Sequence, residues 1–164
     1  WDGSGTYRYS HVSGMLWSTK TFLYGTFEAK IYIPKGYGMW PAFWLFGAND
    51  ERFGEIDIFE YYGHNHRFTY NTHAGKDYGH NLYGKCNGIR LKRLEDSSHY
   101  YRVDWRKKWI KYYIDNRLVG IRSGKHLDIP MNLVISSGIK DIDLDRSNKD
   151  LPNTMNVCRI KYYY

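Results

Sequence analysis

Three carboxylates lie on one short run of the chain, at Glu55, Asp57 and Glu60. Side chains of an extended strand alternate between its two faces, so Glu55 and Asp57 share a face. Glu60 lies five residues beyond Glu55, an odd separation that turns it to the other face unless one extra residue forms a β-bulge. With such a bulge the three acids converge. Two carboxylates with opposed tasks are what glycoside hydrolysis requires.

The distance between the two glutamates fits that chemistry. Strand rise separates their backbones by roughly 13 to 16 Å, and side chains that lean toward each other bring the carboxyls to the ~5 Å typical of retaining glycosidases. Asp57 between them would hydrogen-bond one neighbour and repel the charge of the other, which drives their pKa values apart. The spacing alone also fits an edge strand that carries solvated acids, so the surrounding sequence has to decide.

The surrounding sequence resembles a known family. Residues 36–46, GYGMWPAFWLF, precede residues 54–63, GEIDIFEYYG. Together they resemble glycoside hydrolase family 16, the retaining endo-glycanases that include laminarinases, mixed-linkage glucanases, agarases, porphyranases and κ-carrageenases. The spacing E-x-D-x-x-E is similar to that of its bulged branch. The resemblance implies that Glu55 is the nucleophile, that Asp57 assists it and that Glu60 is the general acid/base.

The resemblance extends over nearly the whole chain. Residues 24–30 resemble the strand before the tryptophan segment, residues 100–115 resemble a later hairpin, and residues 151–157 resemble the closing strand of the family. Family members reach this pattern only after several N-terminal strands. We therefore expect residues 1–164 to form a single glycoside hydrolase catalytic domain that lacks some N-terminal strands, with sheet edges left exposed.

Hydrophobic patterning predicts an all-β fold. Phe27, Ala29, Ile31 and Ile33 alternate with polar residues, which is the pattern of a half-buried strand. Two β-favouring runs, residues 109–114 and 117–119, flank Asp115-Asn116, a pair that tolerates a left-handed hairpin turn. The residues alone fit either a sandwich or a barrel. The family resemblance implies a β-jelly roll, concanavalin A-like, of two packed antiparallel sheets whose concave sheet forms the cleft.

Four residues are candidates for substrate binding. Trp40 and Trp44 lie four residues apart, so they share a strand face just before the acidic run and would offer ring platforms for sugars; core packing is the alternative. Trp105 matches a tryptophan of a later strand in the family, whereas Trp17 has only its aromatic character in its favour and is not included. His73 resembles a family histidine on the strand next to the catalytic one, where it would bind a substrate hydroxyl or the acid/base; a structural role is the alternative.

No metal-ligand set stands out, and no organic cofactor is implied. Many family members hold a structural calcium ion with an acidic residue of the closing strand; here the matching residue is Cys158, which argues against that site. Asp141, Asp143 and Asp145 resemble a calcium loop only superficially. Cys86 and Cys158 are compatible with a disulfide or with two free thiols.

The formal net charge is +7, which admits an anionic partner. Lysine and arginine are scattered and form no nucleic-acid motif, so no nucleic-acid partner is expected. Sulfated galactans would also suit basic side chains, although an ordinary solvated surface is the preferred reading. No membrane-spanning run is present. Because polysaccharides lie outside cells, an extracellular, periplasmic or cell-surface location is expected. The oligomeric state is left open.

These observations lead to one principal function and one alternative. The principal function is retaining endo-hydrolysis of a β-linked polysaccharide, either a β-1,3- or mixed-linkage glucan or a marine-type galactan. The alternative is a catalytically inactive jelly roll that binds carbohydrate on the same aromatic side chains.

Overall fold

The computed structural model describes residues 11–63, 67–76, 81–84, 87–89, 94–95, 97–140 and 151–164. Within these residues the regular secondary structure consists of β-strands, and no helix is present. The strands in chain order are β1 (Gly14–Phe22), β2 (Gly25–Ile33), β3 (Met39–Ala48), β4 (Phe53–Tyr62), β5 (Arg67–Gly75), β6 (Asn81–Gly84), β7 (Asn87–Ile89), β8 (Ser97–Trp105), β9 (Trp109–Ile114), β10 (Arg117–Ser123), β11 (Met131–Ile139) and β12 (Asn156–Tyr163).

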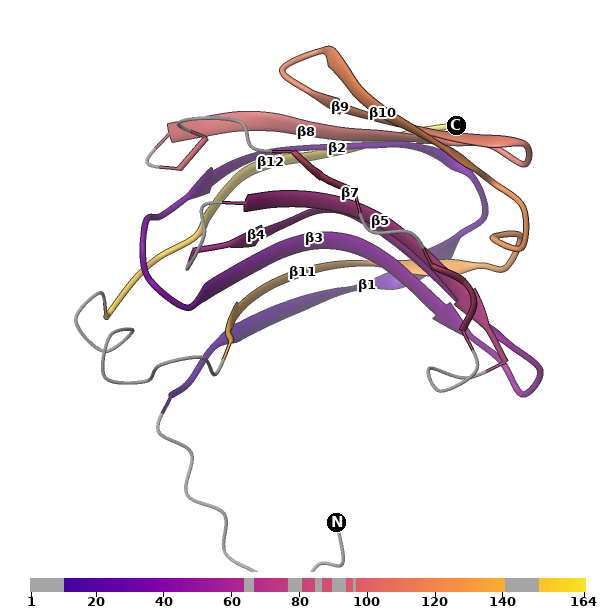
Figure 1. Cartoon of the computed structure of the whole chain (residues 1–164), viewed down its shortest axis with the longest axis horizontal. Helices are drawn as coiled ribbons and strands as arrows, with labels where there is room; N and C mark the ends of the chain where they lie inside the picture. Colours follow the sequence, from indigo (N-terminus) through magenta and orange to yellow (C-terminus); the bar gives the residue numbers. More distant parts are fainter. Residues whose placement is uncertain are drawn as a thin grey trace, which may run out of the picture.

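The strands form two antiparallel sheets that pack face to face, with β2, β8 and β12 stacked over the curved strands β3, β4 and β11 (Figure 1). One sheet has the strand order β1-β11-β3-β4-β5-β6, with β7 also paired to β5, and the other has the order β10-β9-β8-β2-β12. The prediction of an all-β jelly-roll sandwich of two antiparallel sheets is confirmed. No helix in the described ranges has the length and apolar character needed to cross a membrane.

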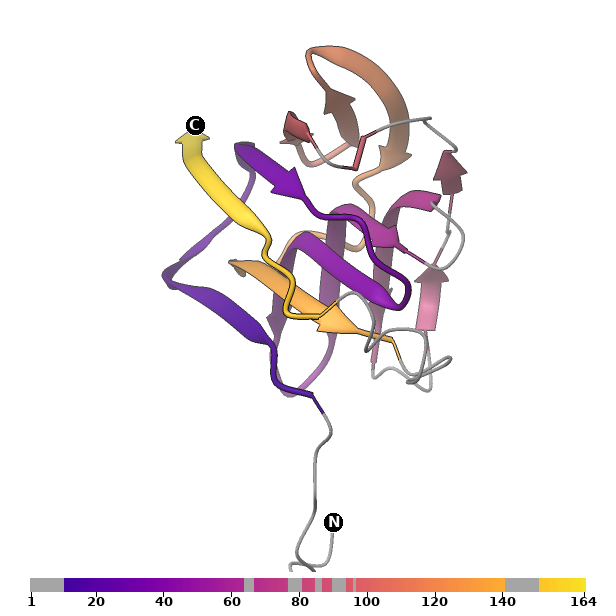
Figure 2. The same ribbon diagram turned by 90° about the vertical axis from the view of Figure 1, so that its left-hand side faces the viewer.

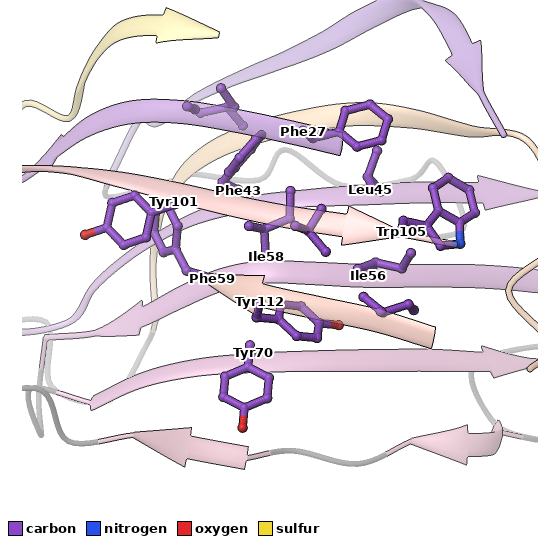
Figure 3. Packing of buried hydrophobic residues seen from close by; sticks show 14 of the residues in the cluster. Phe27, Phe43, Leu45, Ile56, Ile58, Phe59, Tyr70, Tyr101, Trp105 and Tyr112 are labelled. Atoms are coloured by element: carbon purple, nitrogen blue, oxygen red, sulfur yellow. The ribbon is translucent and has the colours of Figure 1, made fainter. Parts of the chain in front are cut away.

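The core lies between the sheets and follows the predicted alternation. Every second residue of β2, from Phe27 to Ile33, is buried. Figure 3 shows Phe27 and Trp105 from one sheet meeting Leu45 and Ile56 from the other. Each of these side chains contributes about 1.5–3 kcal/mol by leaving water. This packing fixes the sheet that carries the acids, because the residues between the acids on β4 belong to the core.

The β9–β10 hairpin forms at the predicted turn. Asp115 and Asn116 have φ angles of 49° and 64°, the left-handed pair that a two-residue turn of this type requires. The Asp115 carboxylate also accepts a 2.9 Å hydrogen bond from the Tyr100 backbone N–H and lies 2.5 Å from Nδ1 of His99. The turn is thereby attached to β8, which stiffens the second sheet.

Two sheet edges lie on the same side of the sandwich, where Figure 2 shows β1 and β12. Large apolar side chains on both strands remain exposed, including Leu16 at 64% and Ile160 at 45%. Both edge strands therefore present apolar side chains to solvent, whereas the expected lack of N-terminal strands and the domain boundaries stay predictions.

Candidate active site

The β-bulge expected in the acidic strand is present, and its extra residue is Ile58. On the side of β3, consecutive residues pair with Phe59 and Asp57, so that Ile58 is skipped. On the side of β5 the register shifts between Asp57 and Glu60. Because both neighbouring strands show the same shift, β4 gains one residue at this point. Glu60 therefore turns to the face that already carries Glu55 and Asp57.

The three acids line a cleft of about 360 Å³ on the face of the sheet that points away from the core. Strands β1, β3, β4 and β11 supply its walls. The lining residues are Ser13, Gly14, Met15, Trp40, Ala42, Trp44, Glu55, Asp57, Glu60, Ser136 and Gly138. The convergence predicted from the spacing is thus what the structure shows.

Glu60 is held by four hydrogen-bond donors. Its Oε1 accepts from Nε1 of Trp40 at 3.0 Å and from the hydroxyl of Tyr62 at 2.9 Å. Its Oε2 accepts from Nδ2 of Asn71 at 2.7 Å and from Oγ1 of Thr69 at 3.2 Å. Bonds to a charged acceptor contribute about 1.5–3 kcal/mol each. The carboxylate therefore has a fixed orientation in the cleft.

Asp57 occupies a drier environment than Glu60. Its side chain is 4% exposed, and burial raises its pKa from 3.8 to about 7, with the negative charges of Glu55 and Glu60 acting in the same direction. A contact of 3.4 Å from Nε2 of His73 to Oδ2 of Asp57 opposes the shift. The same contact is the main reason that the pKa of His73 is raised. Near neutral pH the Asp57 carboxyl therefore retains a large share of its proton.

Glu55 is partly exposed in the cleft and pairs across the sheet with His73 on β5. Ligand atoms of Glu55, Asp57 and His73 all lie within 4.8 Å of one another, close enough to hold a divalent cation. No sequence pattern indicates this grouping, because the residues come from two strands and have no metal-ligand spacing. It arises from the register that places β5 beside β4.

Trp40 and Trp44 share the cleft face of β3, as predicted, and both are only partly buried. The ring of Trp40 stacks on Tyr62 with centroids 5.9 Å apart, and Nζ of Lys140 lies 5.3 Å from the Trp40 centroid. Nε1 of Trp44 donates to Oγ of Ser136 at 3.2 Å. These contacts fix both rings beside the acids, in positions that suit sugar platforms.

Trp17 is an aromatic residue next to the cleft residue Trp44, and the sequence analysis does not include it among the binding residues. It lies on β1, is 48% exposed and meets Trp44 edge-on with centroids 5.9 Å apart. It also contacts Phe46 in the same manner at 6.1 Å. Nothing local in the sequence indicates this placement, because β11 has to lie between β1 and β3 before the rings can meet.

The assignment of Trp105 to substrate binding is wrong. Its side chain is 0% exposed and lies on β8, in the sheet opposite the cleft. Its Nε1 donates to the backbone carbonyl of Leu127 at 3.1 Å, and its ring packs edge-on against Tyr24. Alternation along β8 explains the burial, because Tyr101, Val103 and Trp105 share the core face of that strand.

The predicted binding residue His73 contacts Asp57, one of the three acids of the cleft. For calcium, Cys158 is exposed on β12 with a free thiol, and a thiol is a poor ligand for this hard cation. The residue at that position does not fit a calcium site. Asp141, Asp143, Asp145 and Cys86 lie outside the described residues.

A two-sheet antiparallel sandwich with acids and aromatic rings in a cleft on one sheet is an architecture of carbohydrate-recognising proteins. The family model described as glycosyl hydrolases family 16 matches residues 5–138. The chain belongs to this family. The family resemblance read from the acidic and tryptophan segments is therefore confirmed.

Individual relatives agree with this membership. A beta-glucanase of Rhodothermus marinus is 32% identical over 106 residues, which cover 60% of this chain and 37% of the relative. A beta-1,3-glucan-binding protein of Penaeus monodon is 28% identical over 116 residues, covering 62% and 32% of the two chains. The chain thus spans about a third of these curated relatives. The crystal structure of a kappa-carrageenase from Zobellia galactanivorans superimposes with a TM-score of 0.76 at 26% identity, over 92% of this chain and 70% of that one.

Proposed function

We propose that this chain is a retaining endo-glycoside hydrolase that cleaves a β-linked polysaccharide by double displacement. One observation carries the proposal: the bulge at Ile58 brings Glu55, Asp57 and Glu60 to one face of β4, inside a single cleft. Family membership and the aromatic rings beside these acids support it.

In the first step, Glu60 donates its proton to the glycosidic oxygen while Glu55 attacks the anomeric carbon. The glycosidic bond breaks, the leaving chain departs as an alcohol, and the remaining sugar is joined to Glu55 by an ester bond. In the second step, Glu60 takes a proton from water as the water oxygen attacks the same carbon and releases Glu55. Two inversions at one carbon give net retention.

The environments of the acids suit these roles. Four donors hold the Glu60 carboxyl group in one orientation in the cleft. Asp57 is buried next to Glu55, and its raised pKa means that it presents a proton rather than a second negative charge to the nucleophile. Negative charge on Glu55 is thereby kept available for attack on the anomeric carbon.

The substrates we propose are a β-1,3- or mixed-linkage glucan or a marine-type galactan. The action of relatives on such polymers supports this range, as their names beta-glucanase and kappa-carrageenase state. The rings of Trp40 and Trp44 would bind the apolar faces of the sugars. The mechanism needs no organic cofactor and no metal ion, and we place the reaction in an extracellular, periplasmic or cell-surface setting, where such polymers occur.

A carbohydrate-binding protein without catalysis is the second candidate. One relative, the beta-1,3-glucan-binding protein of Penaeus monodon, favours it. Such a protein would use the same aromatic rings but would not depend on the carboxylates for its only activity, which is binding.

The test is chromatography of products after incubating the folded protein with laminarin, mixed-linkage glucan, agarose, porphyran and κ-carrageenan. We expect oligosaccharides from one polymer, none with Glu55→Gln, and full activity with Glu51→Gln, a matched change on the exposed β3–β4 turn. NMR of the first product should show the β-anomer. Binding without products in the parent and in both variants would instead establish the binding protein.

A further inference from the structure

A second hollow lies at one end of the sandwich, outside the catalytic cleft. Three turns form it: β3–β4, β8–β9 and the connection from β10 to β11, all at the right-hand end of Figure 1. Its volume is about 470 Å³. We call it the cationic hollow, and its lining residues are Arg52, Lys107, Lys108, Gly124, Lys125, His126 and Asp128. None of these residues lines the cleft that holds the acids.

Positive charge dominates the cationic hollow. Nη1 of Arg52 donates to Oδ1 of Asp128 at 2.7 Å, so the single carboxylate is already neutralised. That hydrogen bond is the main cause of the lowered pKa of Asp128, and Lys107 acts in the same direction. Within the described part of the chain, Lys107, Lys108 and Lys125 have no carboxylate at ion-pair distance. Three ammonium groups are therefore available to an anion.

The walls of the cationic hollow are rigid. Leu127 and Ile129 are buried in the core, and the Leu127 carbonyl accepts a 3.1 Å hydrogen bond from Trp105. The Gly124 backbone N–H donates to the carbonyl of Lys108 at 3.1 Å, which joins two of the turns. A Cβ at Gly124 would lie 2.4 Å from the carbonyl oxygen of Arg106, so the turns approach too closely for any other residue. The lysine backbones are thus held in place before a ligand arrives, which lowers the entropic cost of binding.

We propose that the cationic hollow binds an anionic group of a polysaccharide chain, a sulfate ester or a carboxylate, at a site separate from the catalytic cleft. The choice of a polysaccharide rests on the proposed function, because a polymer held in the cleft carries further sugar units outside it. The chemistry rests on the hollow itself, since exposed ammonium groups around a concave surface attract oxyanions and discriminate poorly between neutral sugars.

The cationic hollow also explains where part of the net charge of +7 lies. From the sequence, the preferred interpretation was an ordinary solvated surface. Lys107 and Lys108 are adjacent in the sequence, whereas Lys125 and Arg52 come from two other turns. Only the fold brings these four residues together. Part of the excess charge is therefore concentrated at one place on the surface.

The experiment measures binding in the full chain carrying Glu55→Gln, so that no polymer is cleaved. Affinity electrophoresis at low and high salt uses κ-carrageenan, its desulfated form, alginate and laminarin as probes. We expect retardation by at least one charged polymer and weaker retardation by the neutral ones. Adding K107Q/K108Q/K125Q should weaken binding of the charged polymer about tenfold, from three exposed ion pairs. K107R/K108R/K125R should retain it, because the charge is kept.

The matched control is K20Q/K30Q/K161Q, which removes the same charge on β1, β2 and β12. Equal losses in the two glutamine variants would overturn the proposal, because binding would then follow net charge alone. No retardation by κ-carrageenan or alginate would also overturn it, as would tighter binding of a single-stranded oligonucleotide in the same hollow. Thermal midpoints confirm that each variant is folded. Failure of the proposed function would look different: no products from the parent chain, with binding in the hollow intact.

Discussion

The buried carboxyl of Asp57 makes the stability of the protein depend on pH in an unusual direction. Its pKa in the fold is about 7, raised from 3.8 chiefly by burial. Between those two pH values the folded state holds a proton that the unfolded chain releases. The free energy of unfolding therefore falls as pH rises through this range. The difference between these two pKa values corresponds to about 4 kcal/mol of stability at most.

The Asp57→Asn variant removes this titration and keeps the shape of the side chain. It also removes the main cause of the raised pKa of His73. A raised histidine pKa gives stability that is present below the unfolded value and is lost as pH rises, so this effect has the same sign. We expect the variant to gain stability relative to the parent between about pH 4 and pH 7.5, by up to about 4 kcal/mol.

Urea unfolding followed by tryptophan fluorescence, repeated at half-unit steps of pH, measures the difference. Asp128→Asn is the matched control, because Arg52 lowers the pKa of this exposed carboxyl. The stability that the ionised Asp128 contributes is present above its unfolded-state pKa and is lost as pH falls through its folded-state pKa. Asp128→Asn should therefore be less stable than the parent at neutral pH, and the two proteins should become equally stable in acid. A stability difference for Asp57→Asn that does not change with pH would refute the reasoning.

Three further substitutions test other contacts. Trp40→Phe removes the 3.0 Å hydrogen bond to Glu60 but keeps a ring; kcat should fall about tenfold to a hundredfold with KM little changed, as steady-state kinetics would show. Trp17→Ala removes the edge-on contact with Trp44. The Kd for an oligosaccharide, measured by calorimetry, should rise by a factor equivalent to about 1 kcal/mol. An unchanged Kd would exclude Trp17 from the site. Trp105→Ala should lower the free energy of unfolding by about 3–5 kcal/mol in urea while KM at a temperature of full folding stays the same; a raised KM would restore Trp105 as a binding residue.

Local sequence patterns predict which strand carries the three candidate acids. The spacing of Glu55, Asp57 and Glu60 required one extra residue, and both neighbouring strands show it at Ile58. The four-residue spacing of Trp40 and Trp44 likewise placed both rings on the cleft face. For Trp40 and Trp44 the period of two residues in a strand is enough, whereas the position of Glu60 also depends on the bulge.

Contacts between segments that are distant in the sequence cannot be predicted from local patterns. Trp17 approaches Trp44 only because β11 pairs with both strands that carry them. His73 approaches Asp57 only through the register of β5 against β4. The error over Trp105 was of another kind, because alternation along β8 already placed it with Tyr101 on the core face. For Trp105 this periodicity is a better guide to the position of the side chain than a positional match to a family tryptophan.

The bulge links the stability of the sheet to the geometry of the candidate site. Ile58 and Phe59 are consecutive on β4, yet both belong to the core. If the same sequence formed a regular strand without the bulge, strict alternation would turn Glu60 toward that core and Tyr61 toward the cleft. A buried carboxylate without its four donors costs several kcal/mol. The burial of Ile58 and Phe59 and the donors around Glu60 therefore favour the same register, so the contacts that stabilise the sheet also hold Glu60 on the face that carries Glu55.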